Sequence, residues 1–391
     1  MADYDVPSRL LLGPGPSPVS DRVRLAMAKP LLGHMDPAFL AIVDRVQDKL
    51  RTVFGTNNAL TFPVSGTGSA GMQMSLSNFI EPGDSVLVIE QGVFGQRMAD
   101  AARRLFANVY TIVVPFGSIC TLDNVVAMLD AHPDITMVSV VKAETSTGVL
   151  QPLDGWAEAI HSRGALLLVD AVTALGGIPV DVDAMQFDIV FSGTQKCLAC
   201  PPGLAPITVG DRALKELDAR KTPVVSWYLD LKAISQYLGK SRAYHHTAPV
   251  SMIYALDEAL TAIMEEGLPA VIARHQRVAE SLWAGLEAMD LYLMVKREYR
   301  LPTVATVAIP QGVNDSKVRR RLLGEYGIEI AGGLGDWSGK TWRIGVMGRG
   351  AEPGSMLTLI AALRECLEAE GVATPSGIAA FEDIYWKRGW N

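Results

Sequence analysis

The chain of 391 residues is predicted to fold as an α/β protein with a mainly parallel sheet, followed by a smaller α+β domain. Three observations predict this class. Short aliphatic, β-branched runs alternate with amphipathic stretches, as in right-handed βαβ units. The runs are apolar throughout, which is typical of strands covered on both faces. After about residue 250 the pattern changes to long stretches with apolar residues three and four apart, which predicts helices.

The expected strands of the first domain are separated by helical patterns such as 95–107 and 122–132. The last two expected strands follow each other closely, which favours an antiparallel strand at one edge of the sheet. The strands are, in chain order, 85–90 (SVLVIE), 109–115 (VYTIVVP), 135–141 (ITMVSVV), 165–170 (ALLLVD), 188–193 (DIVFSG) and 205–210 (APITVG).

The C-terminal part is predicted to be a separate, smaller domain. Two helical patterns, 251–267 and 268–289, lead into it, and the second joins the domains. Strands are expected around 303–309 and 341–346, and a helix at 355–369. The last stretch, 374–391, is an aromatic tail with no assigned element. We therefore expect an N-terminal arm over 1–16, a large domain over 17–267 and a small domain over 268–391.

Composition argues against several classes of function. Charged residues make up 20% of the chain, the formal net charge is −7 and no basic block occurs, so no nucleic-acid partner is expected. The apolar runs are far shorter than the roughly 20 residues that span a bilayer, and the N-terminus lacks a signal-peptide pattern, so no membrane partner is expected. Four cysteines make no disulfide framework in so long a chain. We expect a cytoplasmic protein.

Three features of the large domain are candidates for chemistry. Residues 65–69 (SGTGS) precede a helical pattern, where free N–H groups favour an anion, although such a loop is also an ordinary turn. Asp170 ends an apolar strand, where open α/β sheets bind ligands, unless it is a turn or cap residue. Lys196 also follows a strand. In a dry pocket it could form a Schiff base with an aldehyde; otherwise it is a surface lysine covering apolar neighbours.

Together these features meet the needs of pyridoxal phosphate, which requires an anion site, a carboxylate for its ring nitrogen and an amine for its aldehyde. The chain also carries GVFGQR, ETSTGVLQPLD, LLLVDAV, SGTQK with PPG, AYHHTAPV and WRIG. With these motifs it resembles the class V, fold-type I pyridoxal-phosphate aminotransferases, and within them the alanine–glyoxylate (serine–pyruvate) aminotransferases, from residue 10 to about 370. The resemblance implies a seven-stranded, mainly parallel sheet in the large domain.

The resemblance also implies a role for each matching position. Lys196 would hold the cofactor as a Schiff base, and Asp170 would pair with its pyridine nitrogen. The other cofactor contacts would come from Thr67, Gly68, Ser69 and Gln195 at the phosphate, Phe94 and Val172 on the two faces of the ring, Thr145 near the phenolic oxygen, and Tyr244 and Thr247 at the phosphate of the neighbouring subunit.

The same resemblance implies a small substrate. Arg343 would clamp the substrate carboxylate with its bidentate fork, and a single arginine favours monocarboxylic amino acids. Gly15 and Gly33 would lie at the substrate mouth. The implied reaction is a ping-pong transfer of an amino group from alanine or serine to a 2-oxo acid, glyoxylate. Because Tyr244 and Thr247 would serve the neighbour's site, the resemblance implies a homodimer with shared active sites.

The sequence is also compared with the requirements of other functions. A class V enzyme with another donor, such as 2-aminoethylphosphonate–pyruvate aminotransferase, is the main alternative. A pyridoxal-phosphate-binding regulator would carry a DNA-binding domain, for which no basic stretch exists. A desulfurase needs a cysteine on a mobile loop, whereas Cys366 lies in a helical pattern. Cys197 and Cys200 lack the further ligands of a zinc site, so no metal is expected and both are interpreted as packing residues.

Overall fold

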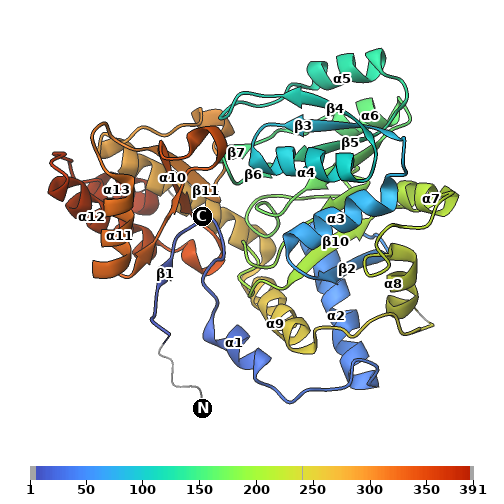
Figure 1. Cartoon of the computed structure of the whole chain (residues 1–391). Coiled ribbons are helices and arrows are strands. Elements are labelled where there is room, and N and C mark those ends of the chain that lie inside the picture. The colour runs from blue at the N-terminus through green and yellow to red at the C-terminus, as the bar shows by residue number, and fades with distance from the viewer. Residues whose placement is uncertain (1–5, 240, 388–391) are drawn as a thin grey trace.

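The computed structural model describes residues 6–239 and 241–387 (Figure 1). Within these residues the largest sheet has seven strands in the order β2-β10-β9-β8-β5-β3-β4. This arrangement confirms the predicted mainly parallel sheet of seven strands. Its strands are β2 (Leu60–Ser65), β3 (Ser85–Glu90), β4 (Asn108–Val113), β5 (Ile135–Val141), β8 (Leu166–Asp170), β9 (Ile189–Phe191) and β10 (Leu204–Val209).

One strand of the large sheet runs against the others. The strands β4, β3, β5, β8 and β9 pair in parallel, whereas β10 is antiparallel to both β9 and β2. The antiparallel strand is therefore one position inside the edge that the sequence predicted, because β2 covers it. Pro63 of β2 lies opposite Pro206 of β10. Proline is tolerated at a sheet edge, but it weakens the sequence signal of a strand, which is why β2 was not expected.

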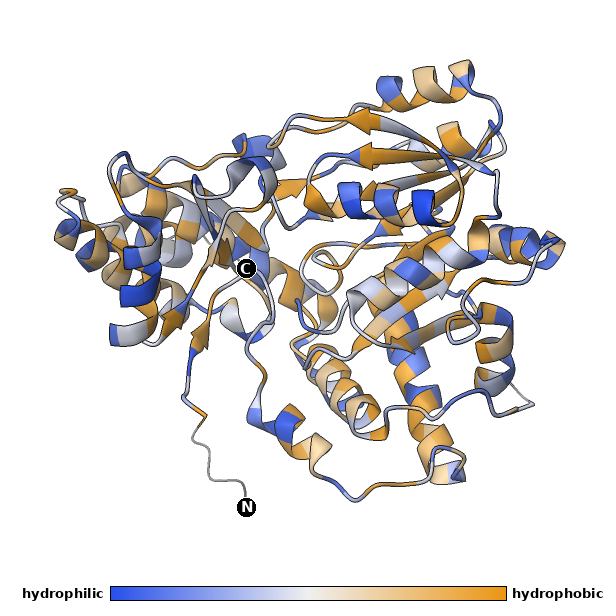
Figure 2. Ribbon diagram, viewed as in Figure 1, coloured by the Kyte–Doolittle hydropathy of each residue, from blue (hydrophilic) through white to orange (hydrophobic). Residues whose placement is uncertain are grey.

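Helices cover both faces of this sheet. One hydrophobic core lies between the sheet and one set of helices, and a second core lies on the other face. Figure 2 shows the strands in hydrophobic colours and hydrophilic residues on the outer turns of α4. The first set is α2 (Pro37–Phe54), α5 (Leu122–Ala131), α6 (Trp156–His161) and α9 (Val250–Glu266), and the second is α3 (Gly68–Phe79), α4 (Val93–Arg104), α7 (Asp211–Ala219) and α8 (Leu231–Leu238).

The C-terminal elements have a hydrophobic core of their own. A three-stranded sheet in the order β11-β14-β13 packs there with the long helix α10 and three more helices. The first five residues of the expected arm and the last four of the expected small domain lie outside the described residues. The elements are α10 (Leu268–Ala288), β11 (Val304–Ala308), α11 (Asp315–Glu325), β12 (Ile328–Glu329), β13 (Ala331–Gly332), β14 (Thr341–Gly345), α12 (Pro353–Ala369) and α13 (Ile378–Lys387).

The helix α13 lies in the tail to which the sequence assigned no element. It packs along α10, and Phe381 on it is fully buried. Just before α13 two glycines allow a close approach: a Cβ on Gly377 would lie 2.2 Å from the backbone oxygen of Gly285. The tail therefore belongs to the small core. Among the described residues, no helix combines the length and apolar character needed to span a bilayer.

The N-terminal arm connects the two cores and leads toward the site. Its strand β1 (Leu10–Leu11) pairs in parallel with β12, and the Gly345 N–H donates to the Leu12 oxygen at 2.7 Å. A few residues later, the Ser17 N–H donates to the backbone oxygen of Gln195 at 2.8 Å. The arm thus passes from the small sheet to the loop that carries Lys196, and the short helix α1 (Asp21–Met27) follows.

Candidate active site

A cavity of about 180 Å³ opens at the carboxyl ends of the parallel strands. The strand β8 ends there at Asp170, and the loop after β9 brings Lys196 to it. This edge is where open α/β sheets bind ligands. Nine residues that the sequence assigned to the cofactor line this single cavity: Thr67, Gly68, Ser69, Phe94, Thr145, Asp170, Val172, Gln195 and Lys196.

The start of α3 gives the cavity an end suited to an anion. Thr67 is the N-cap residue, and its side chain makes no capping hydrogen bond, so first-turn N–H groups are left for a ligand. A Cβ on Gly68 would lie 3.1 Å from Val172 Cγ2, so glycine allows the helix to begin close to the cavity wall. The amide oxygen of Gln195 is buried without a hydrogen-bond partner within the described residues. This oxygen is an acceptor and would need a donor, whereas the amide N–H group of the same side chain can donate to an anion.

Asp170 places a carboxyl group in a dry part of the cavity. Its side chain is 4% exposed, and its Oδ1 accepts from the Val172 N–H at 2.8 Å. Burial raises the pKa of Asp170 to about 7, although the Val172 hydrogen bond lowers it and Lys196 also opposes the rise. A carboxylate in such surroundings is stabilised by a cationic N–H partner.

Lys196 brings a buried amine to the same cavity. The residue is 8% exposed, and its Nζ donates to the backbone oxygen of Pro14. Burial, with a smaller contribution from the nearby Arg343, lowers the pKa of the Lys196 amine to about 8. Gly15, at φ +107°, passes so close that a Cβ there would lie 2.6 Å from Nζ. An amine with this pKa has an appreciable uncharged fraction near neutral pH, as a nucleophile or base requires.

Arg343 lies just behind the lining of the cavity, on β14. It is 7% exposed; its Nε donates to the Gly332 oxygen at 2.9 Å and its Nη1 to the Thr145 oxygen at 3.1 Å. Burial lowers the pKa of Arg343 to about 10. Within the described residues these bonds use Nε and Nη1, which leaves Nη2 available for a carboxylate.

Known proteins resemble the chain over nearly its whole length. The profile of the family Aminotransferase class-V matches residues 27–338. Alanine–glyoxylate aminotransferase of Oryctolagus cuniculus is 40% identical over 366 residues, 93% of either chain. The crystal structure of alanine–glyoxylate aminotransferase from Nostoc sp. has a TM-score of 0.92 and 48% identity over 94% of this chain and 97% of that one. The crystal structure of ureidoglycine–glyoxylate aminotransferase from Bacillus subtilis has a TM-score of 0.96 and 36% identity over 98% of this chain and 99% of that one. The chain belongs to the class V aminotransferases.

Class V aminotransferases are transaminases that depend on pyridoxal phosphate, so the family and the cofactor inferred from the sequence are confirmed. The residues present fit this cofactor. The open helix start suits its phosphate, and Gln195 lines the same cavity with an amide N–H group that can donate to it. The buried carboxyl of Asp170 suits a protonated ring nitrogen, and the buried amine of Lys196 suits its aldehyde.

Three predicted residues of this class V aminotransferase lie away from the cavity. Gly33 and Thr247 line another hollow, of about 400 Å³. The Tyr244 side chain is 62% exposed, with its ring 5.3 Å from that of His34. Within one chain these residues therefore do not join the cofactor cavity. Gly15 does not line the cavity either, but it lies against Lys196.

Two functional candidates of the class V site were not found from the sequence. Glu144 is fully buried, and its Oε1 accepts from the N–H and Oγ of Ser146, whose Oγ in turn accepts from the Val93 N–H at the start of α4. Arg97 lines the cavity with its guanidinium carbon 4.9 Å from the Phe94 ring centre. Arg97 follows Phe94 by three residues, one helical turn, and that spacing was the available signal. The other lining residues are Met72, Val141, Ala143 and Phe191.

Proposed function

We propose that this class V aminotransferase transfers the amino group of alanine or serine to glyoxylate in a ping-pong reaction. The proposal is carried by one observation: the buried Lys196 amine and Asp170 carboxyl share a cavity with Arg343 directly behind its wall. The relatives support the acceptor, since both an alanine and a ureidoglycine enzyme are named for glyoxylate. They differ in the donor, which makes the donor the part most in need of a test.

The residues of the chain would divide the chemistry among them. Pyridoxal phosphate, when bound, supplies an electron sink that stabilises negative charge on the substrate's α-carbon. Asp170 would keep a proton on the ring nitrogen, because its buried carboxylate has little other stabilisation. Lys196 would take the α-proton and return it, because burial makes its uncharged amine accessible near neutral pH. The N–H groups at the start of α3 and the amide nitrogen of Gln195 would donate to the phosphate.

The surroundings of Lys196 support a small substrate. Gly15 lies against its amine, and Pro14 accepts its hydrogen bond, so the arm closes one side of the site. Arg343 is the arginine placed to bind an α-carboxylate. Arg97 at the rim is exposed and stacks on Phe94, so we do not assign it a second carboxylate.

A donor and acceptor panel tests the proposal. The purified enzyme with pyridoxal phosphate is assayed with alanine, serine, (S)-ureidoglycine, 2-aminoethylphosphonate and glutamate, each against glyoxylate and pyruvate. Alanine or serine with glyoxylate should give the highest kcat/KM. A higher value with ureidoglycine would overturn the donor and keep the acceptor. A preference for 2-aminoethylphosphonate with pyruvate would overturn both.

Replacing Arg343 by lysine should weaken carboxylate binding. Lysine keeps the charge but loses the planar fork, and a charge-assisted hydrogen bond contributes about 1.5–3 kcal/mol. KM for both the amino acid and the oxo acid should therefore rise by about 10- to 100-fold. Steady-state kinetics measures this, with Arg319→Lys, which breaks the paired hydrogen bonds to Asp315 on α11, as the matched control. An unchanged KM would move the carboxylate site elsewhere.

We also propose that two copies of the chain form a dimer through the surface around Tyr244. Several large apolar side chains are exposed there: Leu31, Met35, Trp227, Tyr228 and Tyr244. Aromatic rings contact one another across this surface: the ring centres of Trp227 and His245 are 4.4 Å apart, and those of Tyr228 and His246 are also 4.4 Å apart. Exposed apolar surface of this kind is typical of an interface. Through it, Tyr244 and Thr247 would reach the cofactor phosphate of the partner.

Subunit complementation tests the shared site. Lys196→Ala and Tyr244→Ala proteins are each expected to be impaired. In a mixed dimer, one of the two sites combines an intact Lys196 with an intact Tyr244. After subunits exchange, the mixture should therefore regain activity well above the sum of its parts, toward about one quarter of wild type for random pairing. A mixture with no such gain, or a fully active monomer by sedimentation, would contradict the proposal.

The cytoplasm is the compartment we propose for the enzyme. All four cysteines are free and buried, as suits a reducing environment. Burial raises the pKa of Cys197 and of Cys200 to about 12, which favours the unreactive thiol at both positions.

A further inference from the structure

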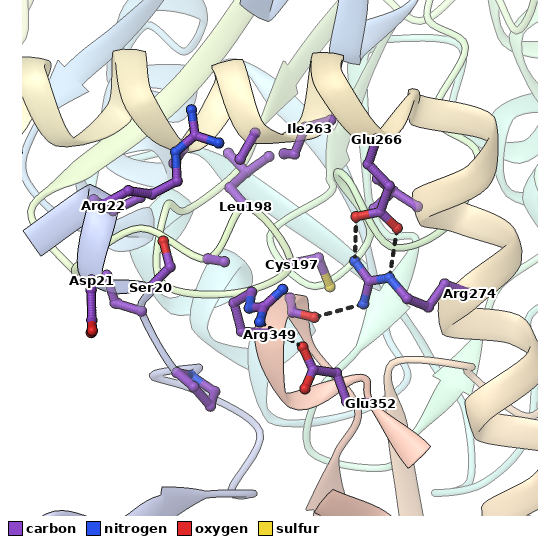
Figure 3. Close-up of a pocket in the computed structure, with 18 of the residues that line it drawn as sticks. Ser20, Asp21, Arg22, Cys197, Leu198, Ile263, Glu266, Arg274, Arg349 and Glu352 are labelled. Atoms are coloured by element: carbon purple, nitrogen blue, oxygen red, sulfur yellow. Dashed lines mark hydrogen bonds and ion pairs between the residues drawn. The ribbon is translucent and has the colours of Figure 1, made fainter. Parts of the chain in front are cut away.

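Two consecutive side chains of helix α10, Arg274 and His275, form hydrogen bonds to a turn of the small domain. Arg274 donates from Nη1 to the backbone oxygens of Gly348, at 3.0 Å, and Ala351, at 2.9 Å. Its other nitrogens pair with both carboxylate oxygens of Glu266, at 2.6 and 3.0 Å. Figure 3 shows Arg274 between Glu266 and the turn beside Cys197. The guanidinium therefore connects α9, α10 and the 3-10 turn Gly348–Gly350.

His275 holds the same turn from its buried side. It is fully buried, and its Nε2 accepts from the Gly348 N–H at 2.9 Å. Because an N–H can only donate, Nε2 is unprotonated, and the ring proton is on Nδ1, 2.7 Å from the Val271 oxygen. Burial lowers the pKa of His275 to about 4, so the ring stays neutral at physiological pH. His275 is thus a fixed acceptor rather than a titrating group.

The turn that these residues hold is pressed against the backbone that follows Lys196. A Cβ on Gly348 would lie 2.7 Å from the Cβ of Ala199. Ala199 has φ +51°, an uncommon conformation for a residue other than glycine, and its N–H donates to the Lys196 oxygen at 3.1 Å. On the other side, Ser17 Oγ donates to the same oxygen at 2.6 Å. The tight turn 196–199 is therefore held from both sides.

The turn 196–199 is also a wall between two cavities. Lys196 lines the cofactor cavity, whereas Cys197, Leu198 and Ala199 line a larger hollow of about 880 Å³ on the outer side (Figure 3). Arg274 and Gly348 line this hollow too. If the turn loosened, water from the hollow would reach the Lys196 amine.

We propose that Arg274 and His275 are positioning residues for Lys196. They hold the turn 348–350 against the turn 196–199, and so keep the amine directed into the cofactor cavity and shielded from water. Neither side chain lines the cofactor cavity, so both act through the backbone. The inference rests on the role proposed for Lys196 and is independent of the substrates. The charged or ionisable groups that act on the amine are Cys197, Arg343, Asp170 and Glu144, and none of these is altered in the test.

The test measures the Lys196 amine directly in the cofactor-free enzyme. Its acylation by a small anhydride is followed as a function of pH by peptide mass spectrometry. The wild-type midpoint should lie near the pKa of about 8. His275→Leu removes the acceptor for the Gly348 N–H, and Arg274→Met removes the two carbonyl contacts. Both should raise the midpoint by about one pH unit, because hydration favours the charged amine.

Two further variants separate positioning from stability. His275→Gln can present an amide oxygen where Nε2 lies, and should restore the wild-type midpoint. Leu282→Ala, in the buried core of the same helix, should lower the melting temperature and leave the midpoint unchanged. A wild-type midpoint in both Arg274→Met and His275→Leu would overturn the proposal. So would an equal shift in Leu282→Ala, or no rescue by glutamine. If His275→Leu does not fold, Arg274→Met decides alone. Since no substrate is present, a failure here is distinct from a failure of the proposed reaction.

Discussion

Replacing Lys196 by alanine should lower multiple-turnover amino transfer by about 10⁴-fold or more, because the variant loses both the covalent attachment point and the proton carrier. The amine is buried and lines the cavity, and among the described residues no other lysine lines it. Steady-state assays measure the loss. Mass spectrometry after borohydride reduction should find the cofactor fixed to Lys196 in the wild type and absent from the variant.

The matched control is Lys142→Ala. Lys142 is also buried, and burial likewise lowers the pKa of its amine. It follows Val141 and precedes Ala143, which both line the cavity, but it does not line the cavity itself. Its removal should leave turnover per folded enzyme within about threefold, because its side chain does not line the cavity and its backbone bond to Asp170 is kept. Full activity in Lys196→Ala would end the proposed mechanism, and equal losses in both variants would point to a structural effect.

The fold could be predicted where one local pattern decided it. The strands from 85 to 210 are apolar runs bounded by helical patterns, and all six lie in the sheet. Three of the elements that were not expected depend on distant contacts. The edge strand β2 contains Pro63 and is completed only by pairing with β10, and β1 has two residues that pair with β12. Helix α13 depends on the close approach of Gly377 to Gly285, which no local pattern reveals.

The residues of the site likewise fall into those that local sequence predicts and those that depend on distant contacts. The nine predicted residues that line the cavity lie at or near strand ends and helix starts, positions that the sequence displays directly. Glu144 was not expected, although its partner Ser146 is only two residues away, because the contact from Ser146 to the start of α4 forms only on folding. Arg274 and His275 look like ordinary helix residues in sequence, since their contacts to Gly348 join distant segments. Tyr244 and Thr247 remain predictions, because their proposed partner is a second chain.

Replacing Asp170 by asparagine should reduce kcat/KM by about 10²–10³-fold and leave the cofactor bound. Asparagine keeps the shape and can still accept the hydrogen bond from the Val172 N–H. It loses the negative charge that would hold a proton on the ring nitrogen, so the electron sink is weakened. Kinetics gives the loss, and equilibrium titration of the cofactor shows that binding persists. Wild-type rates would refute the role of Asp170.

The stability of the same variant separates function from structure. The pKa of Asp170 is raised from 3.8 to about 7 by burial, so the folded state holds a proton that the unfolded state releases above pH 4. In the cofactor-free enzyme this contribution to stability is therefore present at low pH and is lost as the pH rises toward 7. Asp170→Asn does not ionise, so it should melt at a higher temperature than the wild type at pH 8, and the difference should shrink toward pH 5.

The control for this pair of effects is Asp188→Asn, at the other end of the strands. Asp188 is buried as well, but it accepts from the Leu167 N–H at 2.7 Å and lies 2.8 Å from His161 Nε2. Burial raises the pKa of Asp188 too, so its replacement should also change how the melting temperature depends on pH. It should leave kcat/KM per folded enzyme unchanged, unlike Asp170→Asn, because Asp188 does not line the cavity. Asp170 is destabilising in the empty cavity and useful when the cofactor is bound, as expected of a group kept for chemistry. A less stable Asp170→Asn protein at pH 8 would contradict that interpretation.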